Sequence, residues 1–226
     1  YSVSDITLTA GDSVSPSYTV TVTDNNGGTD LTGATAVLYD GATTSLTLGV
    51  CNGGVINDKN CYPDVTCSAG TPSGAQLTYT CAWSSGNAVW FNANASSSWR
   101  MHTIASDDSG PFYGFADSDA FTVFPLSAIS VLQPEIAYGS LALGADSTGQ
   151  TTTFQNVGNQ IIDVTILGAD LTSGVNTLAA GQEKFHHTSS TFDWATGGGF
   201  ALTTTTPVAG DETNGCLNRD LAVREV

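Results

Sequence analysis

The sequence predicts an all-β protein. Thr, Ser, Val and Gly dominate, apolar residues recur at every second position, as in Tyr18, Val20 and Val22, and no helical periodicity is visible. Clusters of Asn, Asp, Gly and Pro, which favour turns, separate these alternating runs. With 226 residues, 40% of them hydrophobic, the chain is long enough to form two β-sandwich domains with cores of their own.

The first predicted domain covers residues 1–126. Its expected strands are residues 2–10, 17–24, 34–39, 76–83, 88–94, 98–104 and 121–126. Residues 24–28 read Asp-Asn-Asn-Gly-Gly, a composition that no strand would cross and that predicts a turn. Pro125 interrupts the last run, and we expect the domain boundary beside it.

The second predicted domain covers residues 127–226. Asn156-Val157-Gly158-Asn159 separates the β-rich runs 150–154 and 161–167, and these residue types predict the turn of a β-hairpin. Further strands are expected at residues 128–132, 181–187, 190–194 and 200–206. Six or seven strands in about a hundred residues is typical of a β-sandwich of the Ig-like or jelly-roll type.

Residues 138–171 also resemble a known kind of module. Tyr138-Gly139 leads to a threonine-rich run at 151–153, the Asn-x-Gly-Asn turn, and a strand that ends in Gly-Ala-Asp-Leu at 168–171. This pattern is similar to that of prokaryotic extracellular Ig-like surface and filament proteins. In architecture the chain resembles subunits of camelysin- and TasA-type and archaeal donor-strand filaments. The resemblance implies a fold and an extracellular location, and it supplies no catalytic residue.

The cysteines predict a disulfide-stapled insert in the first domain, at residues 41–82. Cys51, Cys61 and Cys67 lie within residues 41–74, a stretch without strand alternation where cross-links would fix the backbone, and Cys81 follows in the strand expected at 76–83. A zinc site is the alternative, but no Cys-x-x-Cys pair is present. We expect Cys51–Cys61 and Cys67–Cys81 pairs, and other connectivities stay open. Cys216 is expected to be free, bonded to another chain, or paired within a rearranged set.

Charge limits the partners. The chain carries 21 acidic and five basic residues, a net charge of −16, so it repels nucleic acids and anionic lipid surfaces. No apolar run is long enough to span a bilayer, so no membrane insertion is expected. The start at Tyr1, without Met or a basic segment, fits a chain whose signal peptide has been removed, and predicts a secreted protein.

No cofactor is required by the sequence, but calcium has some support. Asp24, Asn26 and Asp30 could turn several oxygen atoms onto one cation, although no Glu completes an EF-hand loop. A second acidic set comprises Asp107, Asp108, Asp117 and Asp119. Ordinary solvated turns, the favoured interpretation, explain both sets without a cation.

Other candidate sites are weaker. His102, His186 and His187 are expected to be solvated strand residues, because neighbouring residues of a strand point to opposite faces and cannot easily share a metal. The four glutamates are too scattered to supply a pair of catalytic carboxylates, so no enzyme is expected. Asn94 begins the sequon Asn-Ala-Ser and could carry a glycan.

The predicted function is a structural subunit of an extracellular filament or surface layer that assembles from copies of itself. Ile6, Leu8 and Ala10 alternate in the first strand and could be donated to a neighbouring subunit, or could belong to their own domain. The alternative function is a carbohydrate-binding or adhesive module that recognises cell-surface glycans. It requires Trp83, Trp90 and Trp99 to form an exposed row, whereas burial of these rings favours a structural role.

Overall fold

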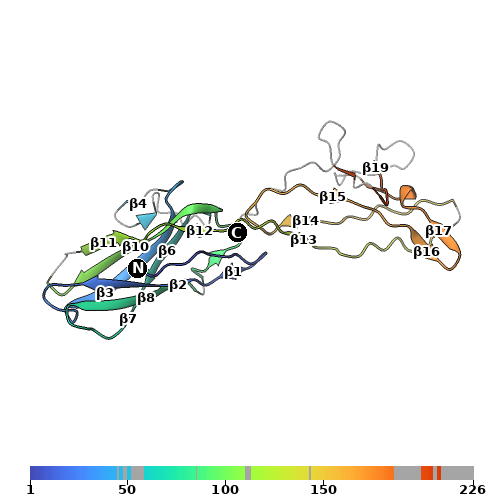
Figure 1. The fold of residues 1–226 in the computed structure, drawn as a ribbon. Coiled ribbons are helices and arrows are strands. Elements are labelled where there is room, and N and C mark those ends of the chain that lie inside the picture. Colours follow the sequence, from blue (N-terminus) through green and yellow to red (C-terminus); the bar gives the residue numbers. More distant parts are fainter. Residues whose placement is uncertain are drawn as a thin grey trace. The chain divides into compact units, whose positions relative to one another are not determined.

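A computed structural model describes residues 1–44, 46–47, 50–51, 59–84, 86–109, 113–142, 144–185, 200–205 and 208–209 (Figure 1). These residues form β-strands and one short 3₁₀ turn, η1 (Ala180–Gln182), with no α-helix among them. The predicted all-β class is therefore confirmed. Within the described ranges no helix is long and apolar enough to cross a membrane.

Contacts group the described residues into two compact units. The first contains residues 1–128 and 157–160, and the second contains residues 129–156 and those that follow 160. The predicted boundary after residue 126 lies close to this division, but residues 157–160 pack with the first unit. The assignment of two separate domains stays a prediction.

The described residues of the first unit form twelve strands. These are β1 (Ser13–Val14), β2 (Ser17–Thr23), β3 (Leu31–Asp40), β4 (Leu46–Thr47), β5 (Val50–Cys51), β6 (Cys61–Thr66), β7 (Ser68–Ala69), β8 (Gln76–Ala82), β9 (Val89–Trp90), β10 (Ser96–Asp107), β11 (Tyr113–Asp117) and β12 (Phe121–Val123).

Two antiparallel sheets of the first unit enclose its core. One has the order β11-β10-β3-β6 with β12 also paired to β10, and the other has the order β2-β8-β7 (Figure 1). Residues of β8 alternate between buried and exposed along its whole length, as expected for a strand with one face on a core. Buried side chains from both sheets form one hydrophobic cluster, so the unit is a β-sandwich.

The N-terminal segment closes an open side of this sandwich. Ser2 pairs with Thr19 of β2, and Ile6 pairs in parallel with Val123 of β12, so the segment bonds to both sheets. Ile6 and Leu8 are buried in the common core. Residues 2–10, predicted as a strand, make only isolated bridges at Ser2 and Ile6, and they pack in the core of their own unit.

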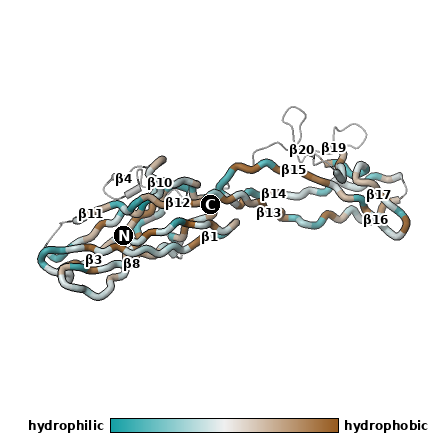
Figure 2. The backbone as a smooth tube through the Cα atoms, viewed as in Figure 1, coloured by the Kyte–Doolittle hydropathy of each residue, from teal (hydrophilic) through white to brown (hydrophobic). Residues whose placement is uncertain are grey.

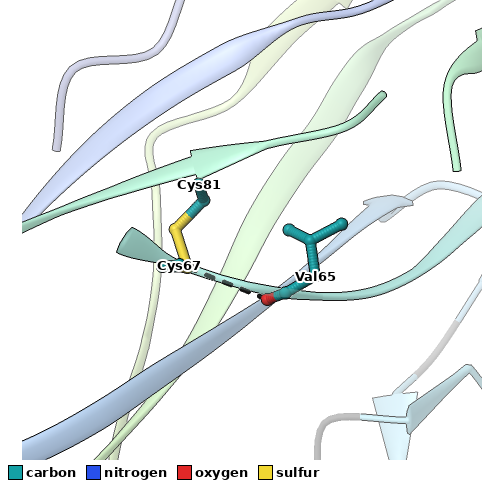
Figure 3. Close-up of a disulfide and its surroundings, with 3 residues drawn as sticks. All are labelled: Val65, Cys67 and Cys81. Atoms are coloured by element: carbon teal, nitrogen blue, oxygen red, sulfur yellow. Dashed lines mark hydrogen bonds between the residues drawn. A yellow bond between two sulfur atoms is a disulfide. The ribbon is translucent and has the colours of Figure 1, made fainter. Parts of the chain in front are cut away.

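A disulfide between Cys67 and Cys81 joins the end of β6 to β8, as predicted (Figure 3). Both residues are buried in the core. Cys67 Sγ lies 3.8 Å from the carbonyl oxygen of Val65. This is a packing contact, because a disulfide sulfur has no hydrogen to donate.

Cys61 is also disulfide-bonded. The side chain of its predicted partner, Cys51, lies outside the described residues, so the Cys51–Cys61 pairing stays a prediction. When the chain is unfolded and alkylated without reductant, we expect no label on Cys61, Cys67 or Cys81. Mass spectrometry of the peptides tests this, and a labelled thiol at any of the three would contradict it.

Tyr18 makes the stability of the first unit sensitive to alkaline pH. The ring packs on Trp83 and Phe121, and its hydroxyl donates to the carbonyl of Ser4 at 3.1 Å. Burial, together with the negative charge of Asp5, raises the pKa of this phenol well above its usual value.

Alkaline unfolding tests this effect. The pKa of Tyr18 is higher in the folded state than in the unfolded state, where it is ~10. The protonated phenol therefore contributes fully to the free energy of unfolding below pH ~10. This contribution is lost as the pH rises from ~10 towards the folded pKa. We expect the free energy of unfolding to fall above pH ~10, and to fall less steeply in Tyr18→Phe. Urea titrations at several pH values measure the slope, and equal slopes would contradict the expectation.

The second unit consists of short paired strands. They are β13 (Ile129–Val131), β14 (Phe154–Asn156), β15 (Thr165–Ile166), β16 (Leu171–Ser173), β17 (Asn176–Leu178), β18 (Lys184–Phe185), β19 (Phe200–Ala201) and β20 (Val208–Ala209). The pairs are β13–β14, β15–β20, β16–β17 and β18–β19. A six- or seven-stranded Ig-like sandwich stays a prediction for this part of the chain.

The predicted hairpin around the Asn-Val-Gly-Asn segment is wrong. β14 pairs with β13 and β15 pairs with β20, so the two runs on either side of residues 156–159 do not pair with each other. The reason is tertiary: Asn159 hydrogen-bonds within the first unit, with the backbone of Leu126, Ala93 and Phe124. Those bonds outweigh the local preference for a hairpin turn.

Apolar side chains of the second unit are more exposed than those of the first. Val164 and Ala180 are buried, whereas Ile161, Leu167 and Val175 are mostly exposed. Hydrophobic positions around β15 and near the tip of the β16–β17 hairpin are visible in Figure 2. Most of the stabilising burial in the described chain therefore belongs to the first unit.

Candidate functional site

A polar cluster lies on the outer face of the five-stranded sheet. Alternate residues of β10, including Trp99 and Met101, face the core, so Arg100 and His102 face outward. His102 Nδ1 lies 2.9 Å from the Asp117 carboxylate on β11. Tyr39 on β3 is paired with Arg100 in the ladder. We call Tyr39, Arg100, His102 and Asp117 the outer-face cluster.

The electrostatics of this cluster keep Tyr39 protonated. Burial raises the pKa of the phenol most, and the charge of Asp117 and a hydrogen bond to its carboxylate raise it further. Arg100 opposes these effects with its positive charge. A protonated phenol is a hydrogen-bond donor and a poor nucleophile.

The His102–Asp117 pair has the form of a base with its orienting carboxylate, but the described residues of the cluster offer it no available nucleophile. The neighbouring hydroxyl, Ser118 Oγ, accepts from the Met101 N–H at 2.9 Å and donates to the Asp119 carbonyl at 2.8 Å. Ser118 is 2% exposed, so its hydroxyl has neither a free position nor access to a substrate. The cluster therefore links three strands, and nothing in its geometry performs acyl transfer.

Asp24, Asn26 and Asp30, the first predicted calcium set, lie in the loop between β2 and β3, which contacts the end of β10. Asp24 Oδ1 accepts the N–H of Asn26 at 2.8 Å, which forms an Asx turn, and Asp30 accepts the N–H of Asp108 on its carbonyl at 3.0 Å. Asp107 Oδ1 accepts the N–H of Ser109 at 2.9 Å. Two of these carboxylates thus already bond to their own loops.

Within the described ranges, no group of three or more His, Cys, Asp or Glu side chains could hold a metal. The second acidic set is also divided, because Asp117 pairs with His102. Calcium at Asp24, Asn26 and Asp30 stays a prediction. Thermal unfolding with calcium and with a chelator tests it, and equal midpoints would contradict calcium binding.

The tryptophans predicted as a possible sugar platform lie in the core. Trp83 and Trp99 have no exposed surface, and Trp90 packs against the same cluster while partly buried. The Trp99 indole N–H donates to the carbonyl of Asn94 at 2.8 Å. An exposed row of these three rings is therefore absent, and the interpretation of Trp83 and Trp99 as core residues is correct.

Asn94, the predicted glycosylation position, is part of a buried network. Its side-chain Nδ2 donates to Asp40 Oδ2 at 2.6 Å, and Asp40 has no exposed surface. A glycan at Asn94 would attach to this same nitrogen and would have to fit beside the buried carboxylate. Glycosylation stays a prediction, which the intact mass of native protein tests.

The three residues predicted to be donated to a neighbouring subunit differ in their burial. Ile6 and Leu8 fill their own core, while Ala10 is exposed. The position of Ile6 and Leu8 matches the alternative considered for this strand, that it is the first strand of its own domain. Residues 186–187, which include two of the three histidines, and Cys216 lie outside the described residues.

No family model, curated protein or solved structure matches this chain, so the functional argument depends on its own residues. The buried Cys67–Cys81 disulfide is compatible with a location outside the cytoplasm.

Proposed function

We propose that the chain is a structural, non-catalytic subunit of an extracellular filament or surface layer, assembled from copies of itself. The observation that carries the proposal is the disulfide buried in the sandwich core, because such bonds persist in oxidising compartments outside the cytoplasm. The high negative charge fits a solvated surface protein that does not bind nucleic acid.

The polar groups of the first unit support a structural role. The outer-face cluster joins β3, β10 and β11, and the Asp40 network joins the end of β3 to residues 94–96. In both places the hydrogen-bonding capacity is used within the fold. The alternative, a carbohydrate-binding module, loses its principal support because Trp83 and Trp99 are buried.

Electron microscopy of purified native material tests the proposal. We expect filaments or ordered arrays that contain this chain. A chain that stays monomeric at high concentration in its native ionic conditions, with no ordered particles, would contradict assembly.

The N-terminal segment supplies a second measurement. Ile6→Ala and Leu8→Ala each create a cavity in the first unit, and each should lower the free energy of unfolding by about 2–4 kcal/mol. Urea unfolding followed by tryptophan fluorescence measures this. Ala10→Ser, at an exposed position of the same segment, should change the stability by less than about 0.5 kcal/mol.

Deletion of residues 1–10 distinguishes the two roles of this segment. Donor-strand assembly would insert Ile6 and Leu8 into a neighbouring subunit, and the truncated chain would then be a folded monomer without filaments. We expect instead that the truncated chain loses most of the stability of its first unit, because both side chains leave their own core. A folded, soluble, truncated monomer would contradict this expectation.

A further inference from the structure

The outer edge of β11 has free backbone groups. Ser118 N–H donates to the Met101 carbonyl across the β10–β11 ladder. Because N–H and C=O groups alternate sides along an antiparallel strand, those of Phe115 and Asp117 point away from β10. β11 pairs with β10 alone, and no further partner of this edge is found in the described part of the chain.

Other sandwich edges carry protective features. Ser2 and Thr19 exchange two backbone hydrogen bonds that cover part of the β2 edge, and Ile6 bonds to the β12 edge. β6 contains Pro63 and the charged Asp64, both of which discourage pairing with another strand. The Tyr1 hydroxyl donates to the Ala116 carbonyl of β11 at 2.6 Å, but this carbonyl lies on the side of the strand that faces β10. Residues 113–117 contain no proline, and none of the described residues pairs with their outer edge.

The side chains of β11 favour pairing instead of preventing it. Phe115 is 74% exposed at the centre of this five-residue strand, an unusual position for a large aromatic residue. Its ring lies 6.0 Å from that of His102. Asp117 is the single charged residue of the strand, and its carboxylate lies 2.9 Å from His102 Nδ1 of the same subunit.

We propose that β11 pairs antiparallel with β11 of a second copy, around a two-fold axis through Phe115. This inference deepens the proposed assembly and depends on it for the choice of a second copy as the partner. Phe115 would then lie directly opposite Phe115 of the other copy, with the two Cα atoms about 5.5 Å apart. Roughly six ladder hydrogen bonds would form between the outward-pointing residues.

Avoidance of like charges selects this register. An axis through Phe115 places Asp117 opposite Tyr113 of the second copy, so the two aspartates lie at opposite ends of the contact. An axis through Asp117 would place like charges directly opposite, which is destabilising. Facing Phe115 rings form the kind of aromatic cross-strand pair that stabilises antiparallel sheets. The two five-stranded sheets would become one continuous sheet.

Sedimentation equilibrium of the full chain tests the contact. We expect reversible dimerisation between about 10 µM and 1 mM, the range of small interfaces. Phe115→Lys and Phe115→Glu each place like charges opposite each other, and each should weaken dimerisation at least about ten-fold. An equimolar mixture of the two variants should restore it, because Lys then lies opposite Glu. Dimers of either single variant with wild-type affinity would overturn the proposal.

Phe115→Pro provides a backbone test. The Phe115 N–H points away from β10, so proline removes a donor of the proposed contact without removing a ladder bond inside the subunit. We expect a folded monomer. Ser97→Lys, at an exposed position of β10, is the control for added charge and should dimerise like the wild type. If thermal unfolding shows that one of the Phe115 variants has not folded, Phe115→Ser is used in its place.

The outcomes separate this inference from the proposed function. A wild-type chain that stays monomeric over the whole range overturns the β11 contact. If Phe115→Lys forms as many filaments as the wild type, assembly uses another surface. That result would overturn the β11 contact and leave the proposed function standing. A wild-type dimer that never forms ordered particles would support the β11 contact and contradict the filament.

Discussion

Asn159→Ala is expected to lower the free energy of unfolding of the first unit by about 2–4 kcal/mol. The Asn159 side chain is 8% exposed and bonds to three backbone groups. Its Oδ1 accepts the Leu126 N–H at 2.6 Å, and its Nδ2 donates to the carbonyls of Ala93 and Phe124 at 2.8 and 3.1 Å. Alanine would leave all three without this partner, and buried polar groups without partners are costly.

The backbone beside Asn159 is equally constrained. A Cβ atom on Gly158 would overlap the carbonyl oxygen of Leu126 and would lie 2.9 Å from the N–H nitrogen of Ala128. Both atoms belong to the backbone, so a rotamer change cannot relieve the clash. Gly158→Ala should therefore also destabilise the unit, by displacing residues 157–160 from their position.

Tryptophan fluorescence during urea unfolding is a suitable measurement, because three of the four tryptophans belong to the first unit. Asn25→Ala removes an amide from an exposed loop of the same unit and serves as the control, with an expected change within about 0.5 kcal/mol. If Asn159→Ala unfolds at the same urea concentration as this control, residues 157–160 do not contribute to the stability of the first unit.

Residues 156–159 also show where local reasoning fails. Asn and Gly types predict a turn at this point, but the position of a turn does not determine which strands pair on either side. The partners of Asn159 lie more than thirty residues away along the chain. Conversely, Gly174, with φ of +60°, makes the two-residue turn between β16 and β17, and the sequence analysis missed this hairpin.

Strands of the first unit were more predictable, because each has one face on a shared core. The expected runs 17–24, 76–83 and 98–104 overlap β2, β8 and β10, whose residues alternate between core and surface. Alternation does not specify which strand lies beside which. The His102–Asp117 contact depends on the register of β10 and β11, and the sequence therefore predicted both residues separately, for other roles.

Asp40→Ala is expected to be the most destabilising single change, by about 3–5 kcal/mol, because several buried donors lose their acceptor together. Asp40 has no exposed surface, and four groups donate to its carboxylate. Oδ1 accepts the Ala42 N–H at 3.1 Å and the Ser96 hydroxyl at 3.0 Å. Oδ2 accepts the Thr43 hydroxyl at 3.0 Å and the Asn94 amide at 2.6 Å. All four donors lose this acceptor in the alanine variant.

An exchange of the two side chains tests whether the Asp40–Asn94 hydrogen bond carries much of this stability. Asp40→Asn replaces one carboxylate oxygen with N–H₂, so in either orientation of the amide two of the four donors face another donor, and we expect a loss of about 1–3 kcal/mol. Asn94→Asp brings two carboxylates together and should also destabilise the unit. The double variant restores one acceptor and one donor, and should recover part of the loss as a favourable coupling energy.

Urea unfolding of the wild type, both single variants and the double variant measures the coupling energy directly. Asp64→Ala removes an exposed carboxylate from β6 and is the control, with an expected change of less than about 0.5 kcal/mol. If the loss of stability in the double variant equals the sum of the two single losses, Asp40 stabilises the unit through Ala42, Thr43 and Ser96 and not through Asn94. If Asp40→Ala is as stable as Asp64→Ala, the network does not stabilise the unit. That result would contradict its role in holding the end of β3 against residues 94–96.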